Sequence, residues 1–85
     1  MPTKSVVVGS AVGLHARPAA IIAEAAGDLD SEVYLCVPGD EPVEASSALL
    51  IMTLGAGNGA TVEVSGDDQA AVDAIAALVE KDLDA

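Results

Sequence analysis

Gly13-Leu14-His15-Ala16-Arg17-Pro18 is the stretch that organises the chain, because it brings the only histidine and the only arginine together just before a helix. Pro18 lacks an N–H and has a φ fixed near the helical value, so it suits the first turn of that helix. Residues 19–26 are mostly strong helix formers, and Gly27 suits the C′ position that ends a helix. The sequence therefore predicts that His15 lies at the N-terminal end of a helix.

The predicted helix start has the chemistry of an anion site. The N–H groups of Ala16 and Arg17 have no acceptor within the helix, and the helix dipole places positive charge at this end. A cation in the first turn opposes the dipole, so an anion held by the guanidinium best explains why Arg17 is there. A lone histidine can also be a surface or capping residue, but Ser, Thr, Asp or Asn would cap better. Because a neutral imidazole has a lone pair that can attack phosphorus, the stretch predicts phosphoryl chemistry at His15.

Two separate stretches resemble one protein family. Residues 13–18 resemble the active-site signature of HPr, the histidine-containing phosphocarrier of the bacterial sugar phosphotransferase system. The stretch Ser46-Ser47-Ala48-Leu49-Leu50-Ile51-Met52-Thr53-Leu54-Gly55 is similar to the serine-headed second helix of that family. The two motifs have the separation found in the family, in a chain of HPr length. The resemblance covers all 85 residues and implies a single HPr domain over residues 1–85.

Composition and charge agree with a small globular domain and exclude several classes of function. Hydrophobic residues make up 52% of the chain, yet Phe and Trp are absent, so small aliphatic side chains have to form the core. The net charge of −11 repels nucleic acid and anionic lipid, and neither is expected as a partner. A single cysteine, Cys36, excludes an internal disulfide. No cluster of Cys or His has metal-ligand spacing, so neither a metal nor a cofactor is expected.

The sequence also bears on location. Residues 1–10 lack the long apolar core of a signal peptide, and no run approaches the roughly 20 apolar residues of a membrane span. We therefore expect a cytoplasmic protein that does not insert into membranes and is a monomer.

Hydrophobic periodicity predicts the element order β-α-β-β-α-β-α. Strands are expected where β-branched residues run together or alternate with polar ones, at residues 3–8, 33–37, 43–45 and 61–65. Ser47 is expected to cap the second helix and Gly55 to end it, while Asp67 and Asp68 open the third. The fold class is α+β, with an antiparallel sheet covered on one face by helices. The HPr resemblance implies the open-faced β-sandwich, with four strands, three helices on one face and a defined strand pairing.

Further predictions concern faces and loops. Cys36 is expected on the sheet face away from the core, as an inert thiol. Residues 55–59 are expected to form a flexible loop rather than a phosphate cradle, because no Lys-Ser/Thr follows them. The segment 48–54 is apolar on nearly every side, which indicates either deep burial or a docking patch. One apolar face of the last helix is formed by Ala71, Ile75, Leu78, Val79 and Leu83.

The HPr resemblance implies a phosphoryl relay, in which the chain is a carrier rather than an enzyme. His15 would accept a phosphoryl group from phospho-enzyme I, itself charged by phosphoenolpyruvate, and pass it to the IIA domain of a sugar permease. The ring nitrogen nearer the main chain (pros) is expected to react, rather than the farther one (tele). Arg17 and Ala16 would bind the phosphate, and Pro18 matches the proline that starts the helix. The resemblance further implies a partner-docking surface made by Ala16, Ile21, Ala48, Leu49 and Met52.

Two alternative functions stay open. Ser47 matches the regulatory serine of the family by its eight-residue distance to Gly55, although Ser46 is adjacent. The chain can therefore be read as a regulatory binding module that acts through the Ser47 helix and is modified by a serine kinase; the same serine can also be no more than a helix cap. The other alternative is a hydrolase with His15 as general base, for which the sequence offers no carboxylate partner and no pocket.

One departure from the family bears on partners. Many HPr proteins carry lysines or arginines near the active site, where this chain has Glu24, Gly27, Ala45 and Leu50. Arg17 is the only cation expected near the site, since Lys4 begins the first strand and Lys81 ends the last helix. We therefore expect a cognate enzyme I with a less acidic, more apolar docking face, whose reaction changes little with salt.

Overall fold

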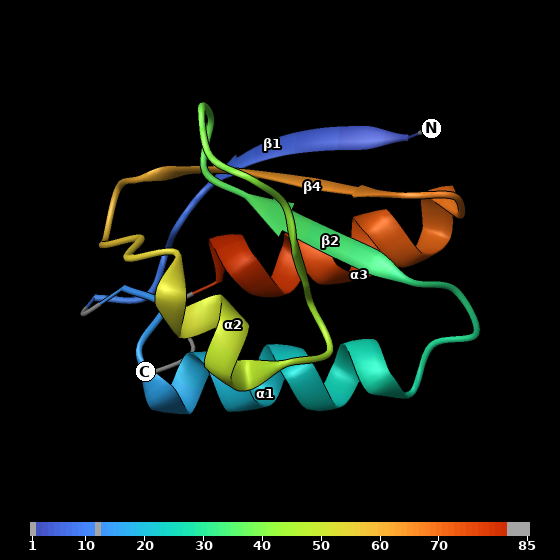
Figure 1. Ribbon diagram of the computed structural model, residues 1–85, viewed down its shortest axis with the longest axis horizontal. Helices are drawn as coiled ribbons and strands as arrows, with labels where there is room; N and C mark the ends of the chain where they lie inside the picture. Colours follow the sequence, from blue (N-terminus) through green and yellow to red (C-terminus); the bar gives the residue numbers. More distant parts are fainter. Residues whose placement is uncertain (1, 12, 82–85) are drawn as a thin grey trace.

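The computed structural model describes residues 2–11 and 13–81 (Figure 1). The predicted order of strands and helices is confirmed. The elements are β1 (Thr3–Val7), α1 (Ala16–Gly27), β2 (Val33–Cys36), β3 (Val43–Glu44), α2 (Ala48–Thr53), β4 (Thr61–Gly66) and α3 (Gln69–Glu80). Leu83, predicted to extend the apolar face of the last helix, lies outside the described residues. None of the described helices is long and apolar enough to cross a membrane.

The four strands form one antiparallel sheet in the order β1-β4-β2-β3. The first strand lies at one edge and pairs with β4, so that Val6 lies opposite Val62. On its other side β4 pairs with β2, where Leu35 lies opposite Val64. The three helices cover one face of this sheet (Figure 1). The predicted α+β fold with helices on one face is confirmed.

The core lies between the sheet and the helices and is built from aliphatic side chains. Alternation along β2 and β4 turns Leu35, Val62 and Val64 toward the helices, and all three are fully buried. Each helix contributes an isoleucine at 0% exposure: Ile22 from α1, Ile51 from α2 and Ile75 from α3. Complete burial of such a side chain is worth about 1.5–3 kcal/mol. These residues join the three helices to the sheet without an aromatic side chain in the core.

The opposite face of the sheet carries Tyr34 and Cys36, as the alternation predicted. The Cys36 thiol donates to the carbonyl of Asp40 at 2.9 Å and is half-buried. Burial raises the pKa of the Cys36 thiol, and the carboxylates of Glu63 and Asp40 raise it further. The thiol is therefore protonated near neutral pH, which agrees with the interpretation of an inert cysteine.

Most helix ends follow the predictions, and one does not. Ser47 Oγ accepts from the Leu50 N–H at 3.3 Å, and Gly55 has a φ of +65° just beyond α2, as expected for a cap and a terminator. The prediction that Gly27 is a C′ residue is wrong, because Gly27 is the last residue of α1 and does not have a positive φ. The chain stays right-handed through Asp28, whose N–H bonds to carbonyls of the last turn. No left-handed residue is needed there.

Each of the four strands begins where predicted but ends one residue away from the predicted end. The second strand ends at Cys36 rather than at 37, and the fourth continues to Gly66 rather than ending at 65. The first strand ends at Val7 rather than at 8, although Val8 is buried and its N–H donates to Ala60 O at 2.9 Å. The third strand stops at Glu44, and Ala45 turns into the core while its N–H still donates to Val33 O at 2.9 Å. At the ends of β1 and β3 the chain leaves the ladder but keeps one hydrogen bond, to the residue before β4 in the first case and to the first residue of β2 in the second.

Candidate functional site

The half-buried His15 is the N-cap residue of α1. Its backbone is extended, with φ −83° and ψ −169°, and its carbonyl accepts the Ala19 N–H at 3.0 Å. The imidazole makes no capping hydrogen bond to the first turn. Among the described residues, no acceptor bonds the N–H of Ala16 or Arg17. The first turn of α1 therefore presents backbone donors next to the imidazole, as the sequence predicted.

Arg17 and Pro18 occupy the first turn in different ways. Pro18 is buried and begins the packed face of α1, whereas Arg17 is exposed. Within residues 2–11 and 13–81 the only ion pair joins Lys4 to Asp73 at 4.0 Å, so the Arg17 guanidinium is not engaged by a carboxylate there. Arg17 therefore lies in the same turn as the donors that follow His15, and no described carboxylate pairs with it.

The segment 55–60 fixes the loop that leads to His15. Leu14 N–H donates to Ala56 O at 2.9 Å, and Gly59 N–H donates to Val8 O at 3.0 Å. Asn58 Nδ2 lies 3.1 Å from the Ser10 carbonyl and 3.4–3.5 Å from the two carbonyls before it. Residues 55–59 are therefore not simply the flexible loop that the sequence predicted. The sequence did not predict that these residues hold the loop before His15. The contacts involved join residues about 50 positions apart, and local composition carries no signal for such contacts.

Gly13 and Gly9 are required by close approaches in the same region. Gly13 has a φ of +85°, and a Cβ there would come within 2.6 Å of Ala56 O. At Gly9 a Cβ would meet the backbone of Glu80 and Lys81. The end of α3 therefore packs against the loop before His15. The fold thus brings the backbone of Lys81 to Gly9, six residues before His15.

A shallow depression lies beside the imidazole. It is lined by Leu14, His15, Ala16, Met52, Gly55, Ala56 and Gly57. Gly55 and Gly57 contribute no side chain, which leaves the imidazole accessible from that side. None of these seven described residues has a carboxylate that could make His15 a general base. The depression offers room for a small anion beside His15 and Ala16, whereas Arg17, one residue further along the same turn, does not line it.

Exposed apolar side chains gather on the two helices next to this depression. The docking patch consists of Ile21 on α1 and Leu49, Leu50 and Met52 on α2, with 36–70% of each residue exposed. Met52 also lines the depression, so the patch is continuous with the site. Of α2, only Ile51 is buried. The sequence left open whether this apolar helix is deeply buried or forms a docking patch, and the exposure of its side chains favours the docking patch.

Two alanines that were predicted to be part of that surface differ in how exposed they are. Ala16 is exposed and lines the depression, whereas Ala48 is half-buried and packs against the core. The two candidate regulatory serines also differ. Ser47 caps α2, while Ser46 is exposed on the preceding turn and lines a hollow at the other end of α1.

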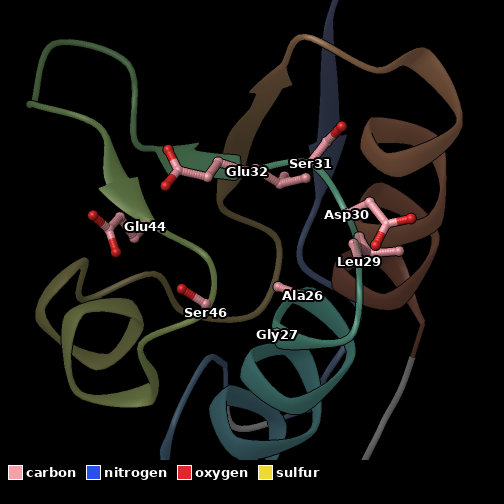
Figure 2. Close-up of a pocket in the computed structure, with 9 residues that line it drawn as sticks. Ala26, Gly27, Leu29, Asp30, Ser31, Glu32, Glu44 and Ser46 are labelled. Carbon is pink, nitrogen blue, oxygen red and sulfur yellow. The ribbon is translucent and has the colours of Figure 1, made fainter.

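That second hollow lies between the end of α1, the start of β2 and the turn before α2 (Figure 2). Asp30, Glu32 and Glu44 border it, but Figure 2 shows Asp30 pointing away from the other two carboxylates. No group of three potential ligands in the described chain could hold a metal ion. The Tyr34 hydroxyl donates to Glu32, and this hydrogen bond to a carboxylate raises the pKa of Tyr34. Among the described residues this hollow therefore provides no metal site.

Comparison with known proteins decides the family. A family model described as PTS HPr component phosphorylation site matches residues 2–81.

The chain belongs to the PTS-HPr family.

Three relatives, named NPr, HPr and Crh, are similar to this chain over nearly their whole length. Phosphocarrier protein NPr of Shewanella violacea is 37% identical over 84 residues, which cover 95% of this chain and 91% of that protein. Phosphocarrier protein HPr of Streptomyces coelicolor is 37% identical over 87 residues, covering 99% and 94%. The HPr-like protein Crh of Halalkalibacterium halodurans is 35% identical over 85 residues, covering 96% and 100%. The structure of HPr from Bacillus anthracis superposes with a TM-score of 0.84 and 31% identity over 92% of this chain and 95% of that one. The chain is thus a phosphocarrier of the HPr family with the open-faced fold.

Proposed function

We propose that this HPr-family protein is the carrier that takes a phosphoryl group from phospho-enzyme I on His15 and passes it to the IIA domain of a sugar permease. The observation that carries the proposal is the half-buried His15 as the N-cap of α1, followed by first-turn N–H groups that have no acceptor among the described residues and by Arg17 in the same turn. Membership of the family supports enzyme I as the phosphoryl donor and a IIA domain as the acceptor. The geometry of the first turn of α1 supports His15 as the residue that carries the phosphoryl group.

The chemical step needs a neutral imidazole. The lone pair of the pros nitrogen attacks phosphorus, the bond from phosphorus to the donor breaks, and its electron pair leaves with the donor. The tele nitrogen keeps its proton, so no general base is required. The N–H groups of Ala16 and Arg17 and the guanidinium stabilise the charge on the equatorial oxygens during transfer. The same step in reverse direction, with a IIA nucleophile, discharges the carrier.

The openness of the site supports a transient rather than a permanent phosphoryl group. One guanidinium and a few amides stabilise the charge in transit, whereas a deep cavity would hinder the approach of a second protein. The docking patch of Ile21, Leu49, Leu50 and Met52 adjoins the depression and would contact donor and acceptor in turn. Overlapping use of one surface implies that the two partners bind one at a time.

A regulatory role through Ser47 is the second candidate, and the similarity to a solved structure described as the catabolite repression containing protein Crh of Bacillus subtilis favours it. Ser47 is the N-cap of the helix that carries most of the docking patch. A phosphate there, added by a serine kinase, would place charge beside apolar contacts and weaken enzyme I binding without unfolding the domain. Ser47→Asp tests this, because acceptance at the unmodified rate would argue against regulation. Ser46→Asp is the matched control, since Ser46 does not cap α2.

The carrier role is tested with labelled phosphoenolpyruvate, an enzyme I and a IIA domain. Wild-type protein is expected to take up acid-labile label and to lose it when IIA is added. His15→Ala should take up none, and Arg17→Ala should fold normally but react roughly a hundredfold more slowly, as expected when one charge-stabilising donor is removed. Lys4→Ala is the control, because it removes a cation on β1 and should react at the wild-type rate. Equal uptake by the His15→Ala protein would refute the assignment.

A further inference from the structure

One exposed face of α1 joins the docking patch to two carboxylates. Ile21, Glu24, Ala25 and Asp28 line a common shallow hollow on this helix. Their spacing of three, four and seven residues places them on one side of the helix, and Arg17 lies one turn before Ile21. The stripe therefore changes from cationic at the His15 end to apolar at Ile21 and acidic at Glu24 and Asp28.

α2 and the segments that flank it add no charge that would cancel these carboxylates. Residues 45–62, which include all of α2, contain no charged side chain. Arg17 is the only cation in α1 and α2. The C-terminal carbonyls of α1 add negative potential at the end where Glu24 and Asp28 lie. The border of the docking patch on this side is thus acidic.

A protein that covers the docking patch has to reach these carboxylates. A standard interface buries about 800 Å² on each partner, a patch about 30 Å across. That is close to a fifth of the 4372 Å² surface of the chain. The 12 residues of α1 span only about 18 Å at 1.5 Å per residue. Charges on the partner opposite Glu24 and Asp28 therefore contribute to recognition, with opposite sign favoured and like sign disfavoured.

We propose that the docking patch recognises an enzyme I whose contact face is apolar opposite Ile21, Leu49 and Met52 and basic opposite Glu24 and Asp28. This inference rests on the proposed function, which makes enzyme I the partner. The sequence predicted a less acidic, more apolar docking face on enzyme I and a reaction that changes little with salt. The stripe on α1 replaces that expectation with an attraction that salt weakens, and the net charge of −11 adds to it at long range.

The test is the affinity for the unphosphorylated enzyme I of the same organism, measured by calorimetry between about 20 and about 300 mM NaCl, a range over which screening becomes strong. The double variant Glu24→Gln with Asp28→Asn removes the acidic border. The matched control, Asp40→Asn with Glu41→Gln, removes the same charge from the β2–β3 loop, on the far side of the sheet from α1 (Figure 1). Circular dichroism verifies that both variants fold.

The border variant is expected to bind about fivefold more weakly at low salt, as for two exposed ion pairs, and the control variant less than about twofold more weakly. Wild-type affinity should fall as salt rises. Unchanged or tighter binding by the border variant, affinity that rises with salt, or no measurable binding would overturn the inference. Because this assay involves no phosphoryl transfer, it is independent of the labelling experiment. Charge-dependent binding without label uptake would refute only the carrier role, and uptake without this charge dependence would refute only the inference.

Discussion

α1 and α3 are both 12 residues long, but their ends are charged in opposite ways. At the start of α3 the Asp68 carboxylate accepts the Ala70 N–H at 3.1 Å, and Lys81 stands at its C-cap. Both charges agree with the helix dipole. In α1 the first turn holds Arg17, and Asp28 is the C-cap residue. Both of these charges oppose the dipole, and no side chain caps the first turn by a hydrogen bond.

The difference shows what holds each helix in place. Both helices bury an apolar face that includes a fully buried isoleucine, so packing against the core stabilises both. Only α3 has ends that add to its own stability. The ends of α1 have charges that suit external groups, an anion at the His15 end and a basic partner at the other. α1 is thus stabilised by its buried middle, and we propose that its two ends serve binding.

The largest expected effects test the buried faces. Ile22→Ala in α1 and Ile75→Ala in α3 each remove a side chain at 0% exposure, and each should lower the free energy of unfolding by about 2–5 kcal/mol. Urea denaturation measures both. A loss below about 1 kcal/mol for Ile22→Ala alone would mean that packing does not hold α1, and the comparison would fail.

The next effect concerns the cap of α3. Asp68→Ala removes the acceptor of the Ala70 N–H and should cost about 1 kcal/mol. Asp68→Asn keeps a capping oxygen and should cost much less, which separates the hydrogen bond from the charge. Thermal or urea unfolding of the two variants provides the measurement, and equal losses would show that the dipole interaction dominates over the cap.

The smallest effect has the opposite sign. Arg17→Ala removes a cation from the first turn of α1 and should raise the free energy of unfolding by about 0.3–0.5 kcal/mol at low salt, while slowing phosphoryl transfer. Arg17→Lys keeps the charge and should unfold like the wild type. If Arg17→Ala were less stable than wild type, the guanidinium would be a structural residue rather than one held for an anion.

The sequence predicted those parts of the fold that depend on neighbouring residues. Alternating valines marked the strands, and Ser47 and Asp68 marked helix starts that the structure confirms. Strand order could not be derived in this way, because alternation tells which face a side chain occupies but not which strand lies beside it. The pairing of β1 with β4, nearly 60 residues away, was available only through the family resemblance. The prediction that Gly27 is a C′ residue was wrong because a glycine permits a left-handed helix end without requiring one.

The candidate site also has some features that neighbouring residues predict and others that depend on long-range contacts. His15, Arg17 and Pro18 lie within four residues of one another, so their positions at a helix start could be predicted from helix-capping and proline preferences alone. The contribution of Asn58 and the approach of Lys81 to Gly9 depend on chain segments brought together only by folding. The acidic stripe on α1 is an intermediate case. Its helical spacing can be read from the sequence, but its exposure beside the docking patch cannot.

Amide NMR of the phosphorylated protein tests most directly whether α1 begins with an anion site. 15N-labelled protein would be charged with enzyme I and phosphoenolpyruvate, and the N–H resonances and hydrogen-exchange rates of α1 and α3 compared with those of the uncharged form. A phosphoryl group on His15 that is held by the first turn should shift the Ala16 and Arg17 N–H resonances downfield and slow exchange in α1, while α3 stays unchanged. Phosphorylated His15 with unaltered Ala16 and Arg17 amides and unaltered exchange in α1 would contradict the anion site.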